Sequence, residues 1–585
     1  MRPSLTVPTR RLLAALTLSC TFAASALAAP PPPRPRAPPP AESGAMARIT
    51  PEQIAAHVRF LASDLLEGRK PGTRGSELAI LYLATELEAM GLQPGAIVDG
   101  KPSFTQPVPM VELKAHVPAT IPFWPLAADS AQAPPLALTT TGGVKAELVM
   151  NADAHVDLAK VDAAELVFVG HGIVAPEYGW DDYKDVDVRG KVVVILNFNP
   201  PFAGEFEGRK IRLWYGRWDY KYLTAAAHGA IGAFVTHTTE TAGYPWQVLS
   251  ASADGSRIDL VPGPDEKRMQ FQGWIEQEAA KKLFALGGKS YDALVEQAAG
   301  KDGKAFKPVP LGVKSSFSMP VDRRPFESAN VVGKLVGSDP KLRDEAVIYT
   351  AHHDHLGRVD RAPGPDGKVP DGIYNGAVDN ASGCASVLTI ANALHDAHGK
   401  RSALFLFTTA EEQGLLGSRY FARHPSVAPG KLAAGINIDS INIFGRTMDV
   451  SMLGLGKSTL DDVVRAAAAV QGRTLHGDAA PDRGGFYRSD QFELARIGVP
   501  VAAFKGGPLF EGRDPKWGVE QEEAWERRDY HQPSDEFHDQ WNLEGAVQDA
   551  QLQLLVGLRV MNAPAMPQWT KNDEFEAARK KALGR

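Results

Sequence analysis

Residues 346–357, AVIYTAHHDHLG, place an apolar run directly before a group of histidines. Two similar junctions follow: FLFTTAEE (405–412) ends in paired glutamates, and GINID (435–439) ends in an aspartate. Short apolar runs of this kind suit the buried strands of a parallel sheet, where ligands gather beyond the carboxyl ends of the strands. We therefore expect these polar residues to converge in space although they lie far apart in the sequence.

Helical patterns alternate with these apolar runs, which is typical of an α/β domain. The segments 328–336 and 346–350 are expected to form two adjacent strands. The helices expected in this part of the chain are 383–395, 415–424, 458–471 and 545–561.

The folded chain is expected to begin near Ile49. Thr50 followed by Pro51 and Gln53 predicts the start of a helix, with Thr50 as its cap. A second helix is expected at 76–90, and the loop before it, rich in glycine and charge, is expected on the surface.

Between 136 and 312 the sequence changes character. Strand-like runs such as 191–196 alternate with turns, and one helical pattern lies at 220–227. We expect a separate, mostly β domain here, inserted into the α/β domain, because the N-terminal helices have no sheet of their own before residue 329. The expected division of the chain is a signal peptide at 1–28, a proline-rich linker at 29–46, an N-terminal part of the α/β domain at 47–135, the inserted domain at 136–312 and the main α/β part at 313–585.

The composition is that of a soluble globular protein of two or three domains. The 585 residues carry a formal net charge of −6, which gives no reason to expect nucleic acid or an anionic membrane as a partner. After residue 28 there is no run long and apolar enough to span a bilayer.

The first 28 residues have the pattern of a secretory signal. Basic residues at 2, 10 and 11 precede an apolar run that ends in Ala26-Leu-Ala28, so we expect a secreted or periplasmic protein. A lipoprotein signal at Cys20 is not expected, because Thr17-Leu-Ser-Cys20 departs from the usual motif at two positions. Cleavage leaves Cys384 as the single cysteine, which excludes an intrachain disulfide.

The polar residues at the strand ends have the character of metal ligands. Two imidazoles and three carboxylates without a thiolate suit zinc, with manganese or cobalt as possible substitutes. Five ligands are more than one catalytic zinc usually takes, and a carboxylate that bridges two metals about 3.5 to 4 Å apart accounts for the excess. The candidates are His352, Asp379, Glu412, Asp439 and His531.

Neighbouring residues suggest supporting roles. Glu411 lies beside Glu412 on an expected strand-to-helix turn, where one carboxylate can bind metal while the other acts as a general base. Asp354 follows His352 by two positions and is expected to hold its imidazole. His353 and His355 are expected to face solvent or line the pocket.

Each candidate also has an ordinary interpretation. Asp379 could cap a helix, since Asp-Asn-Ala-Ser-Gly is turn chemistry, and Glu411 with Glu412 could be an acidic helix start favoured by the dipole. The combination of all five candidates favours a metal site. There is no His-Glu-x-x-His, no Gly-x-Ser-x-Gly and no complete P-loop motif.

Taken together, the motifs resemble those of the secreted co-catalytic di-zinc peptidases, a family that includes bacterial leucyl aminopeptidase, aminopeptidase Y and plasma glutamate carboxypeptidase. The resemblance rests on His352-x-Asp354, Gly376-Ala-Val-Asp379-Asn-Ala-Ser-Gly383, Glu411-Glu412-x-Gly414, Asn437-Ile-Asp439 and Tyr530-His531-x-x-x-Asp535. It implies a mixed, mostly parallel central sheet with helices on both faces.

The resemblance also implies roles for the candidates. His352 and Asp439 would bind one zinc ion, Glu412 and His531 the other, and Asp379 would bridge them. Glu411 would be the general base, and Tyr530 would help to bind the oxyanion. The implied cofactor is thus two zinc ions, and the implied partner is a peptide substrate.

The implied function is a zinc-dependent exopeptidase, most simply an aminopeptidase. Alternatives on the same fold are a carboxypeptidase or dipeptidase, a glutaminyl cyclase-like enzyme and a non-catalytic binding protein. The insert resembles a protease-associated domain at 167–172, 182–183 and 187–191. The charged stretch 505–529 is expected to shape the substrate pocket, whereas the sequence assigns neither an amine-binding residue nor an oligomeric state.

Overall fold

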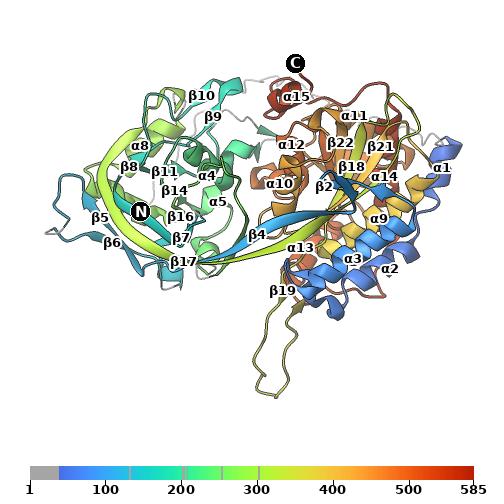
Figure 1. Cartoon of the computed structure of the whole chain (residues 1–585), viewed down its shortest axis with the longest axis horizontal. Coiled ribbons are helices and arrows are strands. Elements are labelled where there is room, and N and C mark those ends of the chain that lie inside the picture. Colours follow the sequence, from blue (N-terminus) through green and yellow to red (C-terminus); the bar gives the residue numbers. More distant parts are fainter. Residues whose placement is uncertain are drawn as a thin grey trace, which may run out of the picture.

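The structure is a computed structural model of the whole chain. It describes residues 39–130, 133–141, 143–153, 155–200, 205–206, 209–251, 255–300 and 303–585. The expected signal peptide and most of the expected linker lie outside these residues. Two lobes lie side by side and are joined by the long strands β4 (Thr105–Ala115) and β17 (Val309–Leu335), which pair along 11 residues (Figure 1).

The larger lobe is built on a sheet whose centre is parallel. β18 (Ala346–His352) pairs in parallel with β21 (Ser402–Thr408) on one side and β22 (Leu432–Asn437) on the other. β22 in turn pairs in parallel with β25 (Val501–Gly506). Every residue of β18, β21 and β22 is buried, as near-continuous apolar runs in a parallel sheet should be.

Antiparallel strands complete this sheet at its edges. β23 (Asp449–Leu453) runs antiparallel to β25 and parallel to β24 (Thr474–Gly477). β17 pairs antiparallel with β21, so β21 lies between β17 and β18. The prediction that 328–336 and 346–350 form adjacent strands is therefore wrong. The apolar run 403–407 lies between them and pairs with both.

Helices cover both faces of the sheet, which confirms the predicted mixed α/β architecture. Alternate residues of β18 separate the two layers, since Val347 and Tyr349 pack into one core and Ile348 packs into the other. The first core is covered by α2 (Pro51–Leu61), α3 (Arg74–Ala89), α9 (Ser382–His395), α11 (Leu460–Val470) and α14 (Glu544–Asn562). The second contains residues of α10 (Leu416–Arg423), α12 (Gln491–Arg496) and the residue before α15 (Glu576–Ala582).

The N-terminal helices match their sequence patterns, with one addition. The Thr50 hydroxyl accepts a hydrogen bond from the Gln53 N–H at 3.4 Å and caps α2 as expected. Residues expected in the linker form a further helix, α1 (Pro40–Met46), and Arg559 of α14 makes an ion pair with Glu42 of this helix. The folded chain thus begins before Ile49.

The smaller lobe has its own sheet and apolar core. Its strands β8 (Leu158–Phe168), β11 (Val192–Leu196), β14 (Gly232–His237) and β16 (Phe271–Glu276) pair in parallel in that order. Its main helices are α4 (Trp218–Ala227), α7 (Gln277–Leu286) and α8 (Tyr291–Ala299). The lobe therefore contains more helix than the strand-like sequence pattern indicated.

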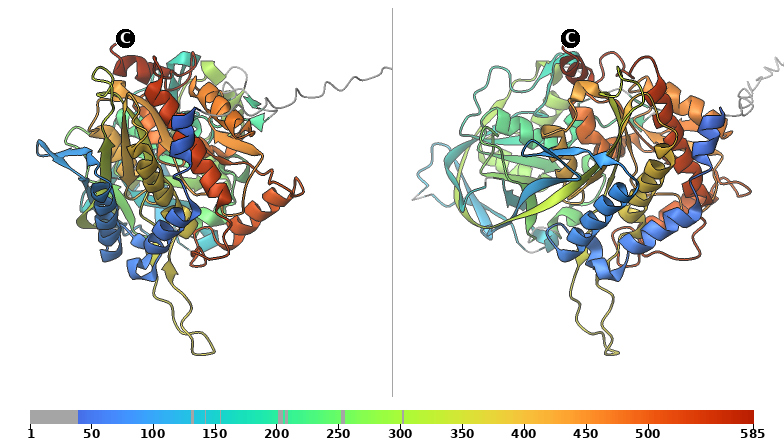
Figure 2. Two further views of the ribbon diagram at one scale, coloured as in Figure 1. Left: turned by 90° about the vertical axis from the view of Figure 1, so that its right-hand side faces the viewer. Right: turned by 45° about the vertical axis from the view of Figure 1, so that its right-hand side comes forward.

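Two features bear on the surface of the molecule. An arm with β19 (Gly357–Arg358) and β20 (Ile373–Tyr374) at its base projects from the larger lobe (Figures 1 and 2). Within the described part of the chain, none of the helices has the length and apolar character needed to cross a bilayer.

Candidate metal centre

The carboxyl ends of the central strands meet at one edge of the sheet. His352 is the last residue of β18 and pairs in register with Thr408, the last residue of β21. Glu411 and Glu412 follow β21 by a few residues, and Asp439 follows β22 in the same way. The predicted convergence of the strand ends is confirmed.

The five predicted ligands surround one small volume. His352 Nε2 lies 3.1 Å from Asp379 Oδ1 and 3.4 Å from Asp439 Oδ1. His531 Nε2 lies 3.1 Å from Asp379 Oδ2 and 3.2 Å from Glu412 Oε2. Each oxygen of Asp379 therefore faces a different histidine, which is the arrangement that a bridging carboxylate requires.

The loop that carries His531 also positions Asp379. The Asp535 carboxylate accepts hydrogen bonds from the Val378 N–H at 2.9 Å and the Asp379 N–H at 3.1 Å. Asp379 does not cap α9: the cap residue is Ala381, without a side-chain bond, and the Asp379 carboxylate points to the histidines. The capping interpretation of Asp379 is therefore excluded.

Two histidines that were expected to face solvent or line the pocket are fully buried. His353 Nε2 lies 3.0 Å from the Ala329 carbonyl oxygen, behind the site. His355 Nδ1 lies 2.7 Å from Glu412 Oε1, and His355, Asp379 and Glu412 form a second group with metal-ligand spacing, beside His352, Asp379 and Asp439. Solvent exposure is therefore wrong for both histidines, because the chain turns inward after β18, and His355 lies at the ligand cluster.

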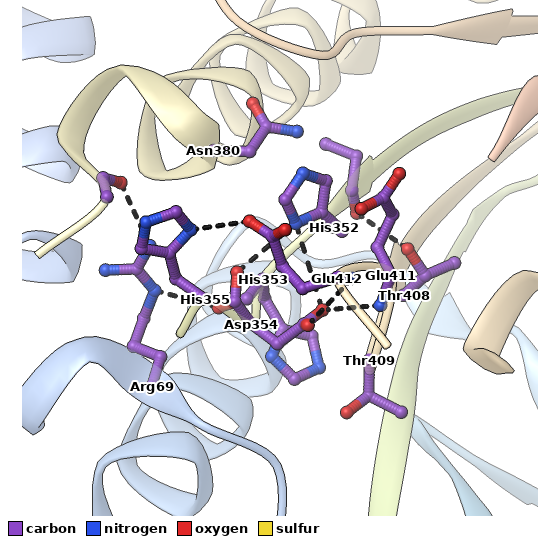
Figure 3. Close-up of polar contacts among 12 residues, drawn as sticks. Arg69, His352, His353, Asp354, His355, Asn380, Thr408, Thr409, Glu411 and Glu412 are labelled. Carbon is purple, nitrogen blue, oxygen red and sulfur yellow. Dashed lines mark hydrogen bonds and ion pairs between the residues drawn. The ribbon is translucent and has the colours of Figure 1, made fainter. Parts of the chain in front are cut away.

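Asp354 contacts the imidazole of His352, as predicted, and also the turn that carries the glutamates. Its main-chain carbonyl oxygen lies 3.2 Å from His352 Nδ1, and its carboxylate Oδ1 lies 3.8 Å from the same nitrogen. The carboxylate accepts hydrogen bonds from the N–H groups of Glu411 at 3.0 Å and Glu412 at 3.4 Å (Figure 3). Asp354 thus orients the imidazole and fixes the turn that carries both glutamates.

The side chains of Glu411 and Glu412 diverge from this turn (Figure 3). The Glu412 carboxylate points to the histidines, whereas Glu411 lines a cavity of about 780 Å³ together with Asp439 and Tyr530. Burial raises the pKa of Glu411 well above its usual range, and the Asp439 and Glu412 carboxylates add to this rise while His352 opposes it. Cations held in the cluster would lower this pKa and leave the carboxylate free to accept a proton.

The bridging position has the opposite electrostatic character. Burial acts to raise the pKa of Asp379, but its contacts with His352 and His531 outweigh burial and hold the pKa well below its usual range. An aspartate that stays ionised while buried is suited to bind cations.

Arg69 binds the loops behind the ligands, and this role was not predicted from the sequence. It lies in the turn before α3, where a surface loop was expected, and is only 1% exposed. Its guanidinium donates to the carbonyls of His353 at 2.8 Å, Asn375 at 2.6 Å and Gly376 at 3.0 Å, and to that of Leu61 (Figure 3).

The donor set fits two zinc ions. Imidazole nitrogens and carboxylate oxygens are zinc ligands, and a carboxylate shared by two histidine-containing groups is typical of a two-metal site. Cys384, the single cysteine in the described residues, is buried, and its Sγ contacts the His352 carbonyl oxygen at 3.1 Å. The cluster therefore contains no thiolate.

Comparison with curated proteins gives partial matches to peptidases. One is "probable leucine aminopeptidase 2" of Aspergillus oryzae, 35% identical over 113 residues, which are 19% of each chain. Another is "Vacuolar membrane protease" of Candida glabrata, 34% identical over 100 residues, which are 17% of this chain and 9% of the relative. The chain thus matches less than a fifth of the length of these relatives.

Among solved structures, the aminopeptidase from Aneurinibacillus sp. strain AM-1 has a TM-score of 0.45 at 18% identity, with 90% of this chain and 97% of that chain covered. The zinc aminopeptidase of Bacillus subtilis has a TM-score of 0.38 at 18% identity, with 87% and 95% covered. Residues 330–555 match the model described as Peptidase family M28. This matched segment contains all five predicted ligands.

Proposed function

We propose that this protein is a zinc-dependent exopeptidase, and specifically an aminopeptidase. The observation that carries the proposal is the position of Asp379 between His352 and His531, with Glu411 directed into the adjoining cavity. The match to peptidase family M28 and the printed names of the relatives support the same reaction.

In the proposed hydrolysis, the ligand cluster holds the metal ions and Glu411 transfers the proton. Two zinc ions held by the cluster would supply Lewis-acid activation of a water molecule. Glu411 accepts the proton of that water, whose oxygen forms a bond to the scissile carbonyl carbon. As the carbon–nitrogen bond breaks, Glu411 returns the proton to the leaving amine.

Two further residues serve this step. Tyr530 stacks on the His531 ring with centroids 3.9 Å apart, and its hydroxyl would donate to the oxyanion. Asp354 holds the Glu411 backbone and so fixes the base relative to the ligands. A complete ligand set with a base beside it favours catalysis over a binding-only role, and the shared carboxylate favours it over one-metal glutaminyl cyclisation.

The cellular setting and the second lobe belong to the same proposal. The sequence pattern of residues 1–28 supports secretion or export to the periplasm. The stretch 136–312 is proposed to be an inserted protease-associated domain, and Arg217, Trp218 and Tyr244 of this stretch line the cavity. We infer that the second lobe forms part of the substrate pocket.

The test is mass-spectrometric identification of products from a mixed peptide pool, with and without a chelator. Stepwise loss of N-terminal residues that the chelator abolishes is expected. Glu411→Gln should abolish the products while two zinc ions per chain remain bound. Glu523→Gln, an exposed glutamate that pairs with Arg527, is the matched control and should keep the activity.

Loss of residues from the C-terminus would instead assign the site to a carboxypeptidase. Near-normal turnover in Glu411→Gln would exclude this residue as the base. No cleavage by a preparation that holds two zinc ions per chain would contradict the proposed reaction.

A further inference from the structure

The cavity beside the ligand cluster carries an acidic group of side chains. Helix α13 (Trp517–Arg528) supplies Glu522 and Glu526, both exposed. Lys505 Nζ pairs with Glu522 Oε1 at 2.9 Å, whereas Glu526 has no ion pair among the described residues. Asp439 and Lys505 line the same cavity as these glutamates, so the acidic group lies near one of the predicted ligands.

A second group in the same cavity is basic. Arg488 follows the short helical turn 485–487 of the larger lobe, and Arg217 comes from the smaller lobe. Arg217 Nε lies 3.3 Å from Asp219 Oδ1, but Arg488 has no ion pair among the described residues. Asp478 lines the same cavity without pairing with either arginine, and its carboxylate accepts from the Ala480 N–H.

The surroundings of Arg488 favour an anion. Burial and the neighbouring Arg217 lower the pKa of Arg488, so two positive charges lie close together, and Arg488 has no carboxylate partner among the described residues. Tyr530 also lies close enough to influence the pKa of Arg488, and its ring stacks on that of the predicted ligand His531. The unpaired guanidinium of Arg488 therefore lines the same cavity as Tyr530 and the predicted ligands Asp379 and Asp439.

The reacting carbonyl of a bound peptide must lie at the ligand cluster, and an extended chain advances about 3.3 to 3.6 Å per residue. A carboxylate one or two residues beyond the scissile bond can therefore reach the basic group. A guanidinium binds carboxylates in a planar, two-bond geometry, which makes arginine suited to this task.

We propose that Arg488, assisted by Arg217, binds a carboxylate of the substrate on the leaving-group side of the scissile bond. The substrates are then short peptides, chiefly di- and tripeptides with a free C-terminus. Such a peptide carries an ammonium group and a carboxylate, which complement the acidic and basic groups of the cavity. This inference rests on the exopeptidase activity proposed above.

The test compares the zinc-loaded enzyme on Leu-Gly, Leu-Gly amide and Leu-Asp amide. The parent is expected to show a kcat/KM for Leu-Gly at least 10-fold above that for the amide. Arg488→Gln should lower this ratio at least 10-fold, and Arg488→Lys should lower it less, since the charge remains but the fork geometry is lost. Arg465→Gln, an exposed arginine of α11, is the control and should leave the ratio unchanged.

A binding measurement separates this inference from the proposed reaction. Calorimetry of Leu-Gly and its amide on Glu411→Gln, and on Glu411→Gln with Arg488→Gln, reports the same preference without turnover. A preference that depends on Arg488 in binding, with no cleavage by the parent, would sustain the inference and reject the peptidase.

The remaining outcomes are equally definite. An Arg488-dependent preference for Leu-Asp amide over Leu-Gly amide would identify an acidic side chain as a source of the carboxylate. Equal rates and affinities for acid and amide forms in the parent, or an equal loss on all three substrates in Arg488→Gln, would overturn the inference.

Discussion

Replacing Arg69 by methionine should loosen the metal site without touching a ligand. The side chain donates to four main-chain carbonyls, of which those of His353, Asn375 and Gly376 belong to the segments that precede or follow predicted ligands. Gly376 O also accepts from the Ala381 N–H, so its loss is smaller than the others. Each remaining carbonyl, left buried without a donor, costs about 1 to 3 kcal/mol.

The three carbonyls would therefore cost up to several kcal/mol, part of which is recovered because a buried guanidinium no longer needs to be desolvated. We expect a net loss of roughly 3 to 5 kcal/mol, within the range that three buried carbonyls without donors would cost. At about 2 to 4 °C per kcal/mol for a domain of this size, the melting temperature should fall by on the order of 10 °C.

The assay combines thermal unfolding with zinc affinity measured by competition against a chromophoric chelator. Displaced ligand loops should weaken zinc binding about 10- to 100-fold, the usual effect of residues that orient metal ligands. Arg69→Lys keeps the charge but has fewer donors and should fall between the parent and Arg69→Met. Arg59→Met, an exposed arginine that pairs with Asp539 at 3.4 Å, is the control and should shift neither quantity measurably. Parental zinc affinity in Arg69→Met would refute the positioning role.

Three other changes test separate parts of the structure. Asp379→Ala should lose both zinc ions as well as activity, and two ions bound with unchanged affinity would rule out the bridge. Tyr530→Phe keeps the ring on His531 but removes the hydroxyl, so kcat should fall about 100-fold with little change in KM if it binds the oxyanion. Burial raises the pKa of Asp182 from 3.8 to about 7, so the folded protein binds a proton there that the unfolded chain releases, and stability should fall as the pH rises from about 4 to 7. The Asp182→Asn variant lacks this dependence of stability on pH, which amounts to at most about 1.4 kcal/mol per pH unit. The melting temperature of the variant, relative to that of the parent, should therefore rise between pH 5 and 7 and level off above pH 7. A difference that does not vary with pH, as expected for the exposed control Asp185→Asn, would contradict the assignment.

The sequence predicted the position of the site because the geometry of a parallel sheet leaves little freedom there. Once 346–352, 402–408 and 432–437 are strands of one sheet, their ends must lie level, as the register of His352 with Thr408 shows. His531 was the exception, since it lies on no strand and was placed by its resemblance to a family motif. Its position depends on Asp535, which binds the Val378 and Asp379 N–H groups.

What the sequence could not predict depends on long-range contacts. The order of β17, β21 and β18 depends on pairing between runs far apart in the sequence, since β21 pairs with β17 on one side and with β18 on the other. The burial of His355 follows from the turn after β18, and its contact with Glu412 joins residues 57 positions apart. Arg69 contacts carbonyls about 300 positions away, and an arginine in a loop rich in glycine has no local feature that distinguishes it from a surface residue.

These contacts assign the acidic residues of the site to two classes. Asp379, Glu412 and Asp439 face histidine nitrogens, whereas Asp354 and Asp535 accept hydrogen bonds from the backbone that carries the first class. Burial raises the pKa of both Asp354 and Asp535 to about 7, so neither needs a full charge to hold the backbone. The ligands, by contrast, must stay ionised while close together, and their mutual repulsion is offset by the histidines that they face and by cations bound among them. The affinity of the site for divalent metal should therefore depend on the ligands and equally on the backbone hydrogen bonds that hold them close together.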